Sequence, residues 1–82
     1  MRTLYEIAAE VRADWTQGKG VSPYAEPYLQ AMETLTSIND RYFMDPGDHI
    51  VMYFLSNANT WKGETARRVK AELKSMLAAV KR

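Results

Sequence analysis

The side chains best suited to acid–base chemistry lie near the middle of the chain. His49 follows Asp48 directly and stands four residues after Asp45. Histidine changes charge near neutral pH, and a neighbouring carboxylate can orient its ring for proton transfer. The two aspartates are better explained as residues that begin a helix. The sequence also has neither a Gly-x-Ser-x-Gly nucleophile motif nor a Gly-rich phosphate loop. We therefore expect no enzyme, no catalytic residue and no cofactor.

A metal site is the second chemistry to consider. One histidine and no cysteine cannot make a zinc site within the chain, and the segment 45–48 lacks the alternating ligands of a calcium loop. Glu6, Glu10 and Asp14 recur every four residues, so a helix would place them on one flank, where they could hold a hard cation. Such an acidic stripe is more often a solvated face, and we expect no metal.

The charges are divided unevenly along the chain. Residues 1–60 hold four basic and eight acidic side chains, whereas residues 61–82 hold seven basic and two acidic ones. At 100° per residue the bases of the last segment fall within about 60° of one another. The bases on this flank are Arg67, Lys70, Lys74 and Lys81.

This basic flank has two interpretations. In the first, the flank binds nucleic acid, because phosphate contacts need Lys and Arg on one exposed face. Alternatively it faces the acidic flank within the bundle, faces it across a homodimer, binds an acidic partner, or is simply solvated. The isoelectric point near 8.0 is below the value above 9 that is typical of nucleic-acid-binding domains. Bases spread along a helix of about 20 residues also differ from a compact recognition helix.

Aromatic residues are frequent, with five Tyr, two Trp and two Phe among 82 residues. Trp15, Phe54 and Trp61 are expected in the core. The remaining candidates cannot all be buried in so small a bundle, and exposed aromatic side chains dominate protein-binding surfaces. The candidates for protein binding are Tyr24, Tyr28, Tyr42 and Phe43.

The elements that position these residues are predicted to be helices. A capping box, Thr3 followed by Glu6, begins a helix over 4–17. Ser22 and Pro23 begin a second over 23–39, which either ends at Asn39 or continues through Tyr42 and Phe43.

The second half of the chain is predicted to hold two further helices. Asp45 as cap and Pro46 at the first position begin a short buried helix over 46–57. The apolar run at 50–55 is also compatible with a buried strand, but no partner strand is evident. Thr60 is the expected cap of the last helix, 60–81. We expect one all-α domain, a compact bundle of about four helices over 1–82.

The chain length limits the size of the core, and the apolar and charged segments bear on the cellular location. A chain of 82 residues buries only about 60% of its unfolded surface, so a homodimer is compatible with the thin core. The longest apolar run, 50–55, is far shorter than the ~18 residues of a membrane span. Glu6 and Glu10 near the start argue against a signal peptide. We expect a cytoplasmic protein that does not bind a membrane.

The chain resembles small accessory proteins of actinobacteriophages, mycobacteriophages above all. The segments that carry this resemblance are 50–73, within which 56–68 is the most distinctive part, and the shorter stretches 1–12 and 27–32. The resemblance implies expression in the cytoplasm of an infected bacterium and transfers no catalytic residue. Small phage proteins often bind host proteins, sometimes toxically, so it implies an interaction with a host or phage protein, and by analogy the modulation or inhibition of a host protein during host takeover.

Overall fold

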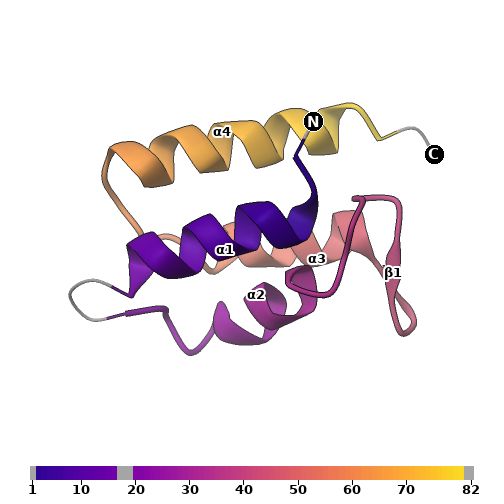
Figure 1. Ribbon diagram of the computed structural model, residues 1–82, viewed down its shortest axis with the longest axis horizontal. Coiled ribbons are helices and arrows are strands. Elements are labelled where there is room, and N and C mark those ends of the chain that lie inside the picture. Colours follow the sequence, from indigo (N-terminus) through magenta and orange to yellow (C-terminus); the bar gives the residue numbers. More distant parts are fainter. Residues whose placement is uncertain (1, 17–19, 81–82) are drawn as a thin grey trace.

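The structure, a computed structural model, describes residues 2–16 and 20–80 (Figure 1). Its elements in chain order are α1 (Leu4–Trp15), α2 (Glu26–Met32), β1 (Arg41–Tyr42), β2 (Asp45–Pro46), α3 (Gly47–Ser56) and α4 (Glu64–Ala78). Helices α1 and α3 each contact both α2 and α4. The predicted all-α bundle of about four helices is confirmed, with one small antiparallel sheet added to it.

The start of α1 follows from its sequence. The Thr3 hydroxyl accepts a hydrogen bond from the Glu6 backbone N–H, and the Glu6 carboxylate accepts one from the Thr3 N–H, so the predicted capping box is confirmed. The next free N–H groups, those of Leu4 and Tyr5, donate to the backbone carbonyls of residues 36 and 35. The helix ends at Trp15, and residue 17, its predicted end, lies outside the described residues.

The second helix is shorter than predicted, covering 26–32 instead of 23–39. Ser22 is not its cap: Ala25 takes that position, and Ser22 instead closes a turn by accepting hydrogen bonds from the N–H groups of Ala25 and Glu26. Beyond the helix, the carboxylate of Asp40 accepts hydrogen bonds from the backbone N–H groups of Thr36 and Ser37. The segment 33–40 therefore forms turns whose carbonyl groups bind the start of α1.

A β-hairpin occupies the segment after these turns. Strands β1 and β2 pair antiparallel, with Tyr42 opposite Asp45. A continuation of the second helix through Tyr42 and Phe43 is therefore wrong, and so is Asp45 as a cap: Pro46 is the cap residue of α3 and makes no side-chain cap bond. The predicted helix over 46–57 is confirmed by α3 at 47–56, which also excludes a strand at 50–55.

The last helix begins later than predicted. Its cap residue is Gly63, with φ +112°, instead of Thr60. The chain before it forms a turn, in which the backbone N–H of Trp61 donates to the carbonyl of Ala58, and the Trp61 side chain is buried in the core. The helix ends at Ala78, while the predicted end at 81 lies outside the described residues.

The three large aromatic residues expected in the core are there. Trp15 is 6% exposed, Phe54 0% and Trp61 2%. The two indole rings stack at 5.6 Å, and Phe54 meets both of them edge-on. Aliphatic residues from all four helices surround them, including Leu4, Ile7, Leu29, Ile50, Val51, Val69 and Leu73. Among the described residues, no helix is long and apolar enough to cross a membrane.

Candidate functional site

The tip of the β-hairpin is the most exposed apolar feature of the described chain. Phe43 is 84% exposed and its neighbour Met44 is 86% exposed. Phe43 has φ +57°, in the left-handed region. This conformation is unusual for a bulky residue, and a two-residue hairpin loop imposes it on its first central position, which glycine or asparagine usually occupies. Two large apolar side chains thus lie in solvent at a strained turn.

The base of the hairpin holds this tip in a defined position. Tyr42 is half-buried against the core, and its ring meets that of Phe43 edge-on at 4.7 Å. Gly47, which follows β2, donates its N–H to the carbonyl of Asp40 at 2.6 Å. The hairpin is therefore attached to the core on one side and to the preceding turn on the other.

The other aromatic candidates do not join this tip. Tyr24 is 76% exposed, in the turn before α2. Tyr28 is half-buried, and its ring lies 5.5 Å from that of Tyr53 on α3. Ring contacts in the described chain thus connect Tyr42 with Phe43 and Tyr28 with Tyr53, but do not connect the two pairs. The four predicted residues form separate features, of which Phe43 is the most exposed.

The pair considered for acid–base chemistry is loosely arranged. The Nε2 atom of His49 lies 4.0 Å from a carboxylate oxygen of Asp48, longer than a hydrogen bond. Asp48 is 8% exposed, whereas His49 is open to solvent on the surface of α3. In the part of the chain that the structure describes, no group of three or more acidic, histidine or cysteine side chains is placed to hold a metal ion.

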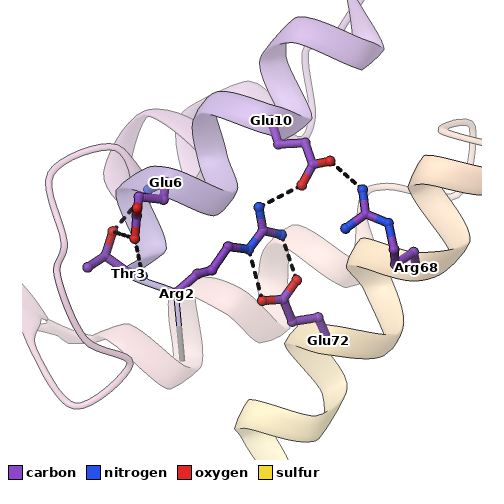
Figure 2. Close-up of polar contacts among 6 residues, drawn as sticks. All are labelled: Arg2, Thr3, Glu6, Glu10, Arg68 and Glu72. Atoms are coloured by element: carbon purple, nitrogen blue, oxygen red, sulfur yellow. Dashed lines mark hydrogen bonds and ion pairs between the residues drawn. The ribbon is translucent and has the colours of Figure 1, made fainter.

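The acidic flank of α1 has partners within the molecule. Glu10 pairs with both Arg2 and Arg68, and Arg2 reaches Glu72 through two parallel hydrogen bonds of 2.6 and 3.1 Å (Figure 2). These four residues, two cations and two anions, form an ionic network that connects α1 to α4. Further along the flank, the carboxylate of Asp14 accepts a 2.8 Å hydrogen bond from the indole N–H of Trp61. The carboxylates of the acidic flank therefore have partners within the described chain.

The ionic network makes the stability depend on pH. The guanidinium groups of Arg68 and Arg2 lower the pKa of Glu10 below its ordinary value of 4.5, and Arg2 lowers the pKa of Glu72 in the same way. A carboxyl group with a lowered folded-state pKa contributes stability that is complete above its unfolded-state pKa and is lost as pH falls through the folded-state value.

We therefore expect the free energy of unfolding to fall as the pH is lowered from about 5 towards 3. The variant Glu10→Gln should fall less over this range, because its side chain cannot be protonated. Urea unfolding at a series of pH values measures both slopes. The matched control is Glu64→Gln, an exposed carboxylate on the first turn of α4, which should leave the slope unchanged. Equal slopes for the wild type and Glu10→Gln would show that the network does not stabilise the fold.

The basic flank of α4 is mostly left without acidic partners. Arg67 and Lys74 are exposed and have no carboxylate partner among the described residues. Lys70 is half-buried: its Nζ donates a 2.6 Å hydrogen bond to the carbonyl of Trp61 and lies 5.8 Å from the centre of that ring. Lys81, the fourth predicted base, lies outside the described residues. The base that pairs with the acidic flank is Arg68, which the prediction did not include.

Two surface residues with clear exposure were missed by sequence reasoning. Met44 was missed because the hairpin turn Phe43–Met44 has none of the Gly, Asn or Asp residues that usually mark such turns. Lys62 lies before the helix that carries the other bases, so helical spacing does not place it with them. The only sequence feature that pointed to Lys62 was the excess of basic over acidic residues after position 60.

Comparison with known proteins gives no family assignment. No protein-family model, no curated protein and no solved structure matches this chain. The resemblance to actinobacteriophage accessory proteins therefore remains a prediction, and the candidate surfaces rest on the geometry of this chain.

Proposed function

We propose that this protein is a non-enzymatic interaction protein whose hairpin tip, Phe43 and Met44, inserts into an apolar pocket of a partner protein. The observation that carries the proposal is the strained and exposed Phe43. A left-handed conformation costs a residue with a side chain about 1–2 kcal/mol. Within the fold the exposed ring contacts only the edge of Tyr42 among aromatic residues, whereas burial of such a side chain in a partner would contribute about 1.5–3 kcal/mol.

The support beneath the tip makes such binding more favourable. Tyr42 packs on the core and contacts the Phe43 ring, so the aromatic side chain is already positioned before a partner arrives. A binding residue that is ordered in the free protein loses less conformational entropy when the complex forms. The geometry therefore favours a preformed anchor over a flexible loop that orders on binding.

The resemblance to phage accessory proteins supports the setting of this proposal. We propose a host or phage protein as the partner, bound in the cytoplasm of an infected bacterium. The alternative partner is a second copy of this chain, because the apolar tip of one molecule could dock on another. Sedimentation of the purified protein distinguishes these partners.

The test is the variant Phe43→Gly. Glycine adopts positive φ without strain, so we expect this variant to be as stable as the wild type or slightly more stable in thermal unfolding. Loss of a central aromatic anchor should weaken partner binding by about 2 kcal/mol or more, roughly 30-fold. The first measurement is capture of a single protein from nuclease-treated actinobacterial lysate at ~500 mM salt, because this salt concentration screens weak ionic contacts. The captured partner is then purified, and its affinity for each variant is measured by titration.

The matched control is Tyr24→Ser, which removes an aromatic side chain of comparable exposure (76%) from a different part of the surface. It should keep the captured protein. Capture that survives Phe43→Gly, or that Tyr24→Ser abolishes equally, would overturn the proposal. If the wild type is a dimer and Phe43→Gly is a monomer, the partner of the hairpin tip is a second copy of the chain instead of a foreign protein.

A further inference from the structure

Four cations lie before and along α4. Lys62 precedes the helix, and three bases follow along it: Arg67, Lys70 and Lys74. The first three of these side chains line a shallow hollow of about 300 Å³, together with Trp61, Gly63 and Ala66. We refer to Lys62, Arg67, Lys70 and Lys74 as the basic cluster.

The charges of the basic cluster are not balanced within the described chain. Glu64 is the one acidic residue between positions 61 and 71, and it forms no ion pair there. The acidic side chains of α1 that contact α4 or Trp61 are already engaged, Glu10 by two arginines and Asp14 by the indole of Trp61. Burial lowers the pKa of Lys70, and the positive charges of Lys62 and Lys74 lower it further. The cluster therefore repels itself, which a bound anion would relieve.

One member of the basic cluster is held in place. The ammonium group of Lys70 donates to the carbonyl of Trp61 and lies over the same ring. Since α-helical residues rise 1.5 Å each, Lys70 and Lys74 lie about 6 Å apart along the axis of α4, and Arg67 and Lys74 about 10 Å apart. This spacing gives an extended row of positive charge, longer than a single phosphate group requires.

We propose that the basic cluster binds the phosphate backbone of a nucleic acid without reading its sequence. The extended row of cations matches a chain of phosphates, and phosphate contacts by Lys and Arg supply most of the affinity in sequence-independent binding. Base reading is not expected, because Trp61, the aromatic residue of the hollow, is 2% exposed and cannot stack with a base. This site is distinct from the hairpin tip: α4 begins at one end of the long axis and the hairpin lies at the other (Figure 1).

The test is binding of a fluorescent random-sequence DNA duplex to the full chain, followed by anisotropy at salt concentrations of ~50–300 mM. Four phosphate contacts predict that log K falls against log salt with a slope of about −3.6. The double variant Arg67→Ala/Lys74→Ala should reduce this slope to about −1.8 and weaken binding at ~50 mM salt by about a hundredfold. These side chains form no hydrogen bond or ion pair in the described fold, so thermal unfolding should change little.

The control is Arg41→Glu, an exposed base of the hairpin. This substitution lowers the net charge by the same two units as the double variant, so it separates a localised site from general attraction. It should leave most of the affinity in place. The proposal is overturned if the wild type does not bind the duplex, if its slope is near zero, or if Arg41→Glu and the double variant weaken binding equally.

The outcome is independent of the proposed protein interaction. Phe43→Gly should bind the duplex as the wild type does, and Arg67→Ala/Lys74→Ala should still capture the protein partner at high salt. Loss of both activities in either variant would show that the two surfaces are one site, which contradicts the placement of the basic cluster described above.

Discussion

The variant Trp61→Ala is expected to destabilise the fold by about 3–5 kcal/mol, the usual loss for a buried large aromatic side chain. Because domains of this kind have a total stability of about 5–15 kcal/mol, with short chains near the lower limit, most of the margin would disappear. Urea unfolding followed by far-UV circular dichroism measures the change. We expect a midpoint far below that of the wild type, and a partly unfolded population at 37 °C.

Three contacts explain why this tryptophan matters. Its ring stacks on Trp15 and lies edge-on to Phe54. Its indole N–H donates to the Asp14 carboxylate at 2.8 Å. Removal of the side chain leaves a cavity between helices and an Asp14 carboxylate without its donor.

A double-mutant cycle separates these contributions. Trp61→Phe keeps much of the apolar surface but loses the indole N–H, and Asp14→Asn weakens the acceptor. If the bond from Trp61 to Asp14 stabilises the fold, the double variant should lose less than the sum of the two single losses. Additive losses would restrict the role of Trp61 to packing. A loss below about 1 kcal/mol for Trp61→Ala would contradict its placement in the core.

The variant Gly47→Ala is expected to destabilise the fold, although alanine normally stabilises a helix relative to glycine by about 1 kcal/mol. A Cβ atom at position 47 would lie 2.7 Å from the carbonyl oxygen of Ile38 and 2.9 Å from that of Asp40. Both neighbours are backbone atoms, so neither can rotate away. We expect a loss of about 2–3 kcal/mol, which lowers the melting temperature of a chain this short by roughly 10–20 °C.

A second glycine provides the control. A Cβ atom at Gly63 would meet no atom within 4 Å, so Gly63→Ala tests the effect of its positive φ of +112° without a clash. Its loss should be smaller, about 1–2 kcal/mol. Thermal unfolding of both variants shows which substitution causes the larger loss of stability. A Gly47→Ala variant that is as stable as the wild type would show that the hairpin base is looser than the structure has it.

Features set by neighbouring residues were predictable from the sequence. Thr3 and Glu6 mark the start of α1 because their two hydrogen bonds span only three positions. The apolar run of α3 and the three buried aromatic residues also follow from composition and spacing, since a chain this short must bury its largest apolar side chains. Because so small a bundle cannot bury every aromatic ring, the sequence also indicated that some aromatic residues remain exposed, and Phe43 was among the candidates.

Features set by distant residues required the tertiary structure. Arg2 meets Glu72 across 70 positions and Arg68 meets Glu10 across 58, so spacing along one helix does not reveal which cation is neutralised and which is free. The second helix ends at Met32, and the carbonyl groups of residues 35 and 36 bind the start of α1, about 30 positions earlier, a contact that local propensity does not reveal. The sequence by itself thus determined the helical class and the core. Tertiary packing decided which bases of α4 lack an acidic partner and how the hairpin is attached to the core, because both depend on contacts between residues that are distant in the chain or on different elements.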